Sequence, residues 1–222
     1  MNNNKISINI KIAAGLLIVI CMTGAIAFAE ELKPVELSAP QMDRGKLLMQ
    51  ALKERQSNRD FSDKELPLDV ISNLLWAASG VNRPDSGKLT APTAKNRQEI
   101  DIYVAMQKGL YLYNPQKHIL EPVAAKDIRE FTGLQGFTAR APLDLIYVAD
   151  YSRADGDEKD REYYSGLDTG FVSQNVYLFC ASEGLATVVL GSIDKPALAK
   201  IMNLRKDQKI ILTQPVGYPG SK

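Results

Sequence analysis

The stretch LDTGFVSQNVYLFCA, residues 167–181, says more about the fold of this chain than any other segment. Apolar side chains occupy almost every side of the helical wheel along it, among them Phe171, Val172 and Val176. A helix that is apolar all round has to be buried all round. A single small domain achieves this most easily if a second subunit covers one side of the helix. The sequence therefore predicts a homodimer.

Strands are predicted on both sides of this helix. Residues 143–149 form a nearly continuous apolar run, which is typical of a strand covered on both faces and predicts a central place in a sheet. Turn residues bound further strand-like segments at residues 100–106, 109–113, 118–123, 185–190 and 210–216. The segments on either side of Asn114-Pro115 are expected to form a hairpin. A helix is predicted over residues 195–203.

Two amphipathic helices are predicted near the start of the domain. The first ends near Arg55, and its apolar face consists of Leu47, Leu48, Ala51 and Leu52. The second follows Pro67, and its apolar face consists of Val70, Ile71, Leu74, Leu75 and Ala78. Residues 30–41 lack apolar periodicity and predict a flexible lead-in, so the folded domain is expected to span residues 42–222.

The first 29 residues have the pattern of an export signal. Lys5 and Lys11 flank the start of an apolar run that extends over residues 12–20, and Ala27-Phe28-Ala29 resembles a cleavage site. The alternative is an uncleaved anchor, but the run is shorter than the roughly 20 residues that span a bilayer. The sequence therefore predicts a signal peptide over residues 1–29, an exported, periplasmic chain, and no membrane attachment after cleavage.

Composition argues against several classes of function. The chain has 27 lysines and arginines against 26 aspartates and glutamates, without the clustered positive charge of a nucleic-acid surface. Cleavage would leave Cys180 as the sole cysteine, so no intramolecular disulfide is expected. His118 is the sole histidine, which leaves too few ligands for a zinc site of the usual kind. The alternation of polar and apolar residues around His118 predicts that it is a surface strand residue.

One polar segment indicates anion binding. In Arg55-Gln56-Ser57-Asn58-Arg59, an extended backbone beyond the helix end would direct Arg55, Ser57 and Arg59 to the same side. Two guanidinium groups and a hydroxyl can bind a phosphate through charge-assisted hydrogen bonds. The alternative is that the arginines only offset the negative end of the helix dipole.

Two further segments could contact a flat ligand. Asn96 offers amide donors and an acceptor that suit an imide edge, although a turn cap would use the same side chain. Gly191 allows backbone to approach a flat ligand closely, although a routine turn would also use a glycine. The chain contains neither G-x-G-x-x-G nor a P-loop motif, which argues against both of those nucleotide-binding folds.

In this order, the three segments resemble those of the FMN-dependent nitroreductase family. The family's R-x-S-x-R signature corresponds to residues 55–59, and its P-S-A-x-N-x-Q segment to residues 92–98, with Thr93 in place of serine. Residues 184–191 match its G-L-x(5)-G segment, and residues 217–219 match its closing G-Y-P. The resemblance implies an α+β fold with a central, mostly antiparallel sheet flanked by helices, an intertwined homodimer, and two FMN molecules at the subunit interface.

The resemblance also implies roles for individual residues. The R-x-S-x-R side chains would bind the phosphate and ribityl chain, Asn96 would face the isoalloxazine from the partner subunit, and Leu190 and Gly191 would lie near N5. The full set of implied flavin-binding residues is Arg55, Ser57, Arg59, Asn96, Gln98, Leu190, Gly191 and Lys222. No side chain is expected to act as a catalytic acid, base or nucleophile, because the cofactor carries the redox chemistry.

By the same resemblance, the expected activity is transfer of hydride or electrons through flavin N5, from a reductant such as NADH or NADPH to a planar small molecule such as a nitroaromatic or a quinone. Residues 81–91 and the Tyr111/Tyr113 hairpin look closest to the branch of azoline-oxidising dehydrogenases. Oxidation of a heterocyclic substrate is therefore an alternative, although Tyr163-Tyr164 lacks the adjacent lysine which that branch uses. A flavin-binding protein without turnover is a second alternative. Export would also separate the protein from the cytoplasmic nicotinamide pool.

Overall fold

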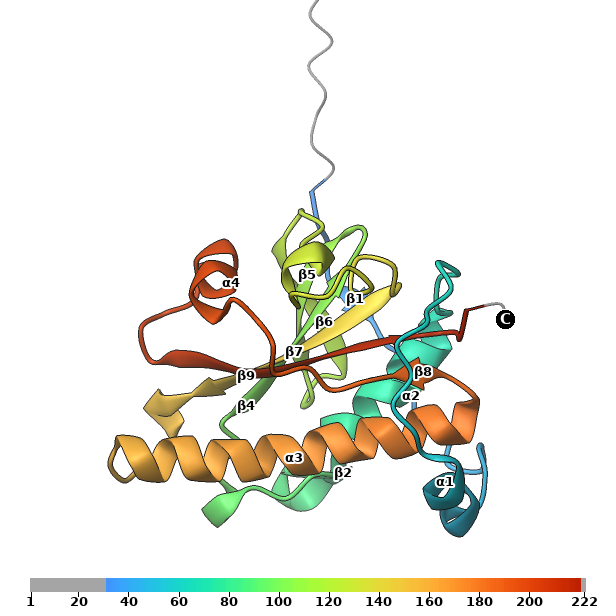
Figure 1. The fold of residues 1–222 in the computed structure, drawn as a ribbon. Helices are drawn as coiled ribbons and strands as arrows, with labels where there is room; N and C mark the ends of the chain where they lie inside the picture. Colours follow the sequence, from blue (N-terminus) through green and yellow to red (C-terminus); the bar gives the residue numbers. More distant parts are fainter. Residues whose placement is uncertain (1–30, 221–222) are drawn as a thin grey trace, which may run out of the picture. The chain divides into compact units, whose positions relative to one another are not determined.

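A computed structural model describes residues 31–220, so the predicted signal peptide and Lys222 lie outside the described residues. These residues build a seven-stranded sheet in the order β1-β6-β5-β4-β7-β9-β8, and all neighbouring pairs are antiparallel (Figure 1). The strands are β1 (Val35–Glu36), β4 (Ile100–Met106), β5 (Gly109–Asn114), β6 (Ile119–Ala124), β7 (Leu143–Asp150), β8 (Ala186–Thr187) and β9 (Gln208–Gly217). The predicted hairpin is β5–β6. A separate two-stranded hairpin consists of β2 (Val81–Arg83) and β3 (Lys88–Leu89).

Strand β7 lies in the interior of the sheet, as its apolar sequence predicts. It pairs with β4 on one side and β9 on the other, and all eight of its residues are buried. Because side chains alternate across a strand, Leu145 and Tyr147 join the core on one face, whereas Ile146 and Val148 join the core on the other. Burial on both faces explains the lack of polar alternation.

Helices cover both faces of the sheet, which confirms the predicted α+β architecture. Helices α2 (Leu68–Ser79) and α3 (Glu158–Glu183) pack on one face, and α1 (Leu48–Glu54) packs against α3. Helix α4 (Lys195–Ile201) covers the other face through Leu198 (Figure 1). Four short 3₁₀ helices complete the described chain: η1 (Pro84–Ser86), η2 (Ala94–Asn96), η3 (Arg129–Phe131) and η4 (Tyr151–Arg153). No helix within residues 31–220 is both long and apolar enough to cross a membrane.

Helix α3 is longer than its apolar stretch predicts, because both ends are capped. The Asp157 carboxylate accepts a hydrogen bond from the Asp160 N–H at 2.9 Å, and Gly184 ends the helix in the left-handed region at φ 71°. The buried face includes several polar residues, whereas Leu167 and Phe171 are 45% and 48% exposed. The single chain therefore leaves one side of the helix uncovered, and its burial by a second subunit stays a prediction.

The segment predicted as a flexible lead-in is ordered against the domain from Glu31 onward. Val35–Glu36 pairs with β6 as an edge strand, and the Gln41 N–H donates to the Asn73 side chain at 2.8 Å. Val35 and Leu37 also pack against the core, and their spacing of two residues is the strand period. The folded part therefore begins before Met42, and the prediction of a flexible lead-in is wrong for residues 31–41.

His118 is a turn residue, which corrects its prediction as a surface strand residue. Its backbone is left-handed at φ 53°, immediately before β6. Its ring nitrogens form hydrogen bonds with the Tyr113 hydroxyl at 2.9 Å and the Ser72 hydroxyl at 2.8 Å. Burial lowers the pKa of His118, which favours the neutral ring.

Candidate active site

The polar segment after α1 lies against a tyrosine of α3. Arg55 leaves the helix with ψ 120°, and its guanidinium carbon lies 5.2 Å from the centre of the Tyr177 ring. The Ser57 hydroxyl is 2.9 Å from the Tyr177 hydroxyl. Arg55 and Ser57 therefore lie on one side of the chain, as the sequence predicts. Arg59 is exposed.

Tyr177 also binds the third predicted segment. Its hydroxyl accepts a hydrogen bond from the Val189 N–H at 2.9 Å, and nearby the Asn58 N–H donates to the Thr187 carbonyl at 2.9 Å. Two segments that are more than a hundred residues apart in sequence thus meet at one side chain. Tyr177 was predicted only as part of the apolar helix. The sequence feature that could have indicated this role is the Tyr177 hydroxyl, because a tyrosine on a buried helix needs a polar partner.

A cavity of about 560 Å³ opens beside this junction. It is lined by Lys46, Lys53, Glu54, Arg55, Gln56, Asn58, Tyr177, Cys180, Ala181, Gly184, Leu185 and Pro219. Three of these residues carry positive charge, and one of them, Lys46, is paired with Glu54 at 2.6 Å. Lys53 and Arg55 add two more positive charges to the lining, so the cavity has an excess of positive charge of the kind that attracts an anionic group.

The end of the third segment is a buried leucine followed by an exposed glycine. Leu190 is 4% exposed and exchanges two backbone hydrogen bonds with Thr213 of β9, at 2.8 and 3.1 Å. A Cβ atom built on Gly191 would meet only the end of Leu212, at 3.8 Å. Packing within the chain therefore does not require a glycine here. The predicted strand over residues 185–190 is shorter in the structure and covers Ala186–Thr187.

The second predicted segment has an unusual backbone. Lys95, Asn96 and Gln98 have φ between 51° and 55°, in the left-handed region that side chains normally avoid. Each such residue costs about 1–2 kcal/mol relative to right-handed backbone. Hydrogen bonds within the chain hold this conformation: the Ala94 N–H donates to Asp168 at 2.9 Å, and the Gln98 N–H donates to the Thr93 hydroxyl at 2.9 Å.

The two predicted side chains of this segment contact each other, because the Gln98 amide donates to the Asn96 side-chain oxygen at 3.4 Å. Asn96 is exposed, whereas the Gln98 amide donates to the Gly87 carbonyl at 3.0 Å and so ties the segment to the β2–β3 hairpin. The segment is anchored on α3 at Asp168, nine residues before Tyr177, which corresponds to roughly 13 Å along a helix. A single chain therefore anchors Asn96 at a different point of α3 from Arg55.

Large apolar side chains are exposed near both ends of α3. They are Leu47, Leu48, Met49 and Leu52 in and before α1, and Tyr163, Tyr164, Leu167 and Phe171 in α3. Lys46, two residues before α1, donates to the Ser182 hydroxyl and the Ala181 carbonyl at the C-terminal end of α3. Leu47 directly precedes α1 and the other seven lie on α1 and α3. Exposed large apolar side chains that gather in this way are typical of surfaces used in protein association.

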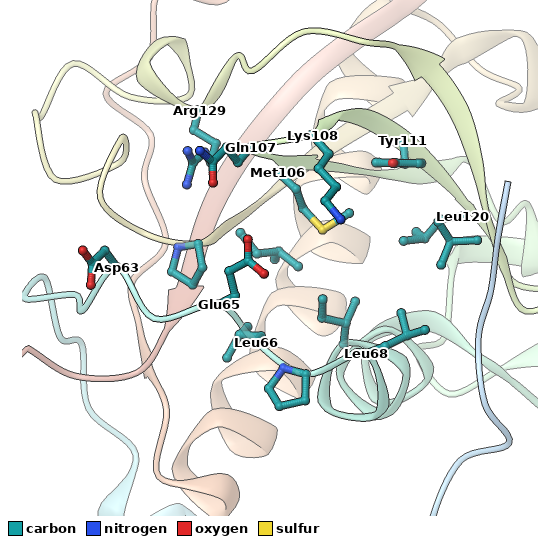
Figure 2. A pocket seen from close by; sticks show the side chains of 15 residues that line it. Asp63, Glu65, Leu66, Leu68, Met106, Gln107, Lys108, Tyr111, Leu120 and Arg129 are labelled. Atoms are coloured by element: carbon teal, nitrogen blue, oxygen red, sulfur yellow. The ribbon is translucent and has the colours of Figure 1, made fainter. Parts of the chain in front are cut away.

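A second cavity, of about 430 Å³, lies above the N-terminal turn of α2 (Figure 2). Its floor includes Leu66 and Leu120, and Figure 2 shows Glu65 and Lys108 reaching toward its centre from opposite sides. None of the candidate residues within 31–220 lines this cavity. The cavity is therefore separate from the junction at Tyr177.

The fold and the junction can be compared with known proteins. A model of the nitroreductase family matches residues 52–218. A protein of Methanocaldococcus jannaschii, provisionally named a nitroreductase, is 31% identical over 194 residues, which cover 82% of this chain and 96% of that protein. A crystal structure of a nitroreductase, also provisionally named, from Ralstonia eutropha JMP134 has a TM-score of 0.83 at 42% identity, covering 89% of this chain and 94% of that one.

A more distant relative is the iodotyrosine dehalogenase 1 homolog of Caenorhabditis elegans, 25% identical over 78% of this chain and 54% of that protein. The fold and these likenesses define an oxidoreductase of a flavin-dependent class. This chain belongs to the nitroreductase family.

Proposed function

We propose that this protein binds FMN between two identical subunits and passes electrons to a planar acceptor such as a nitroaromatic or a quinone. The observation that carries the proposal is the junction at Tyr177, where one hydroxyl joins Ser57 of the predicted phosphate segment to Val189 of the segment before Gly191. The residues around it fit the cofactor, because a cavity lined by Lys53 and Arg55 opens at Tyr177. Gly191, two residues after the Val189 that Tyr177 binds, leaves room for a flat ring to approach the backbone.

Each part of the junction has a separate task in this proposal. Arg55, Ser57 and Arg59 would hold the phosphate and ribityl chain, and Tyr177 orients the first two by ring contact and hydrogen bond. Leu190 is buried and would exclude water beside the flat ring, while Gly191 lets backbone approach it. The bound flavin would supply the hydride and electron chemistry that amino-acid side chains lack.

The exposed apolar surface on α1 and α3 supports a homodimer. In a two-fold assembly the same patch meets itself, so the N-terminal half of one α3 can approach the C-terminal half of the other. Asn96 is exposed, and Asp168 accepts the N–H of Ala94 two residues before it, so Asn96 would then reach the flavin of the partner subunit. An amide presents donors and an acceptor, which complement the imide edge of the ring.

Export is part of the proposal and bears on the donor. The pattern of residues 1–29 supports secretion, and NADH and NADPH are concentrated in the cytoplasm. We propose that either nucleotide can reduce the isolated protein, whereas a different electron donor serves it outside the inner membrane. The alternative of flavin binding without turnover is separated from this proposal by the experiment that follows.

The test is a visible absorption spectrum of the mature protein after incubation with FMN and desalting, followed by anaerobic titration with NADH or NADPH. Retained flavin that is bleached, and then reoxidised by a nitroaromatic, a quinone or an iodotyrosine, supports the enzyme. Retained flavin that no donor and acceptor pair can cycle supports a binding protein. Absence of retained flavin overturns the proposal.

A further inference from the structure

Asp144 of β7 is a fully buried carboxyl group on the face of the sheet opposite α3. Its neighbours in register are Ala105 of β4 and Pro215 of β9, which offer no polar side-chain group. Oδ1 of Asp144 has no hydrogen-bond partner within residues 31–220, and Oδ2 lies 2.6 Å from the Thr132 hydroxyl. A carboxylate in this place would lose its hydration without replacement, so burial strongly disfavours the charged form.

Positive charge near Asp144 is already paired. The charged groups that act on it are Arg129 and Asp127. Arg129 donates through Nε and Nη2 to the Asp127 carboxylate, at 3.0 and 2.6 Å, and through Nη1 to the Ala141 carbonyl at 2.9 Å. Such a two-pronged pair neutralises the guanidinium locally. All three side-chain nitrogens of Arg129 therefore have partners other than Asp144.

The Thr132 hydroxyl lies between two oxygen atoms but has one proton. Its oxygen is 2.6 Å from Asp144 Oδ2 and 2.8 Å from the Arg129 carbonyl oxygen, which also accepts the Thr132 N–H at 3.2 Å. A carbonyl oxygen has two lone pairs and can only accept. Both hydroxyl contacts are hydrogen bonds only if Thr132 donates to Arg129 and Asp144, as a neutral acid, donates to Thr132. Burial acts in the same direction, because it raises the pKa of Asp144 well above its ordinary value.

Thr132 is also attached to the segment that precedes Gly191. Its carbonyl accepts a hydrogen bond from the Thr213 hydroxyl at 2.6 Å. Thr213 in turn exchanges two backbone hydrogen bonds with Leu190, at 2.8 and 3.1 Å. Thr132 and Thr213 are both fully buried, so water does not compete for these contacts. A continuous chain of hydrogen bonds therefore runs from Asp144 to Leu190.

The two residues after Thr132 contact the same turn directly. A Cβ atom built on Gly133 would lie 2.9 Å from Leu190 Cδ1, so the backbone at Gly133 lies against the Leu190 side chain. The Leu134 N–H donates to the Ser192 carbonyl at 3.0 Å. Residues 132–134 therefore hold the turn at the residue before Gly191 and at the residue after it.

We infer that Asp144 is a neutral acid at neutral pH and that, through Thr132, it positions the turn at residues 190–192 against the flavin ring. This inference rests on the proposed function, in which Gly191 allows the ring to approach the backbone. Asp144 and Thr132 are positioning residues, because they act on the ring through Leu190 and Ser192. The neutral acid supplies the donor that completes the chain of hydrogen bonds without placing an unpaired charge in the core.

The first experiment determines the protonation state of Asp144 in the mature protein without added FMN. A neutral carboxyl group absorbs infrared light at a higher frequency than the amide groups or a carboxylate. The difference spectrum between wild type and Asp144→Asn, recorded at neutral pH, should contain this absorption. Asparagine keeps a donor toward Thr132 without a charge, so hydrogen exchange of residues 190–193 in Asp144→Asn should stay within about twofold of wild type.

The second experiment removes the connection between Asp144 and the turn. Thr132→Val keeps the shape of the side chain but loses the hydroxyl, so exchange of residues 190–193 should quicken about tenfold. The rate of flavin reduction at saturating NADH or NADPH should fall about tenfold, whereas the FMN dissociation constant should stay within about threefold of wild type. The matched control is Thr169→Val, at a fully buried threonine of α3 whose hydroxyl has no partner within residues 31–220. It should change neither rate.

Each outcome decides a separate point. A difference spectrum without the acid absorption, or exchange that quickens as much in Asp144→Asn as in Thr132→Val, overturns the neutral acid. A wild-type rate of flavin reduction in Thr132→Val overturns the positioning role, whatever the exchange rates. Failure of wild type to bind FMN overturns the proposed function instead, and the infrared spectrum and the exchange rates then still decide whether a neutral Asp144 holds the turn.

Discussion

The C-terminal half of α3 contacts a junction whose parts all belong to one chain. The N-terminal half instead holds the loop that carries the exposed Asn96. At the C-terminal half, Tyr177 joins Ser57 to Val189 beside a basic cavity. At the N-terminal half, Asp168 holds a loop whose Asn96 is exposed, and Leu167 is exposed close by. The difference teaches that one half completes its polar contacts within the chain, whereas the other leaves groups exposed that the proposed second subunit would contact.

The largest effect is expected from a charge placed among the exposed apolar side chains at the middle of α3. Phe171→Asp would bury a carboxylate in the proposed interface, so the dimer should dissociate and FMN affinity should fall by more than about a hundredfold. Analytical ultracentrifugation measures the first effect and flavin fluorescence the second. Leu134→Asp, at an exposed leucine in the loop after η3, is the control and should remain dimeric. A dimeric Phe171→Asp protein would place the interface elsewhere.

A smaller effect is expected at the junction within one chain. Arg55→Met keeps much of the side-chain volume but removes the guanidinium, so FMN affinity should fall about ten- to a hundredfold while the dimer persists. Equilibrium dialysis with FMN checks this. Lys200→Met, an exposed cation on α4 across the sheet, should have no effect. If both variants lost the same FMN affinity, Arg55 would act only through the overall positive charge of the protein.

Removal of a single hydroxyl probes the link between the two segments at the junction. Tyr177→Phe keeps the ring under Arg55 but loses the contacts to Ser57 and Val189. We expect a loss of about 1 kcal/mol in unfolding free energy and about fivefold in FMN affinity. Denaturant unfolding and fluorescence titration measure the two losses. Tyr164→Phe in the N-terminal half of α3 is the matched change. A larger loss of FMN affinity in this variant than in Tyr177→Phe would contradict the distinction between the two halves of α3.

The smallest effect is expected far from both halves, at the turn of His118. Because burial lowers the pKa of His118, the folded protein binds fewer protons there than the unfolded chain. Stability from this group is present above the unfolded pKa of about 6.5 and is lost as the pH falls through the folded pKa. Unfolding midpoints at pH 5 and pH 7.5 should therefore differ more in wild type than in His118→Asn. FMN affinity should be the same in both proteins.

The sequence predicts those parts of the structure that depend on local pattern. The apolar run of β7, the hairpin β5–β6 and the position of α2 follow from spacing alone, because burial on one or two faces leaves a periodic trace. The edge strand Val35–Glu36 was missed because two residues are too few to show a period and two prolines flank the segment.

The candidate residues were found by motif, whereas the residues that hold them were not. Arg55 and Ser57 meet at Tyr177 in the structure, but nothing near Tyr177 in sequence indicates a hydroxyl shared by two distant segments. Asp168 lies inside an apolar helical stretch, where a buried carboxylate is visible only once Ala94 is known to pack above it. Long-range contacts of this kind leave no trace in periodicity.

Helix α3 also constrains how this sequence can change over evolutionary time. Asp168 and Tyr177 serve different parts of the molecule from one continuous helix, so their angular and axial offsets are fixed together. Insertion or deletion of one residue between them would rotate one relative to the other by about 100° and shift it by about 1.5 Å. Either the hydrogen bond between Asp168 and Ala94 or the one between Tyr177 and Val189 would be lost. The eight intervening positions should therefore vary among descendants only by substitution, and their number should stay constant.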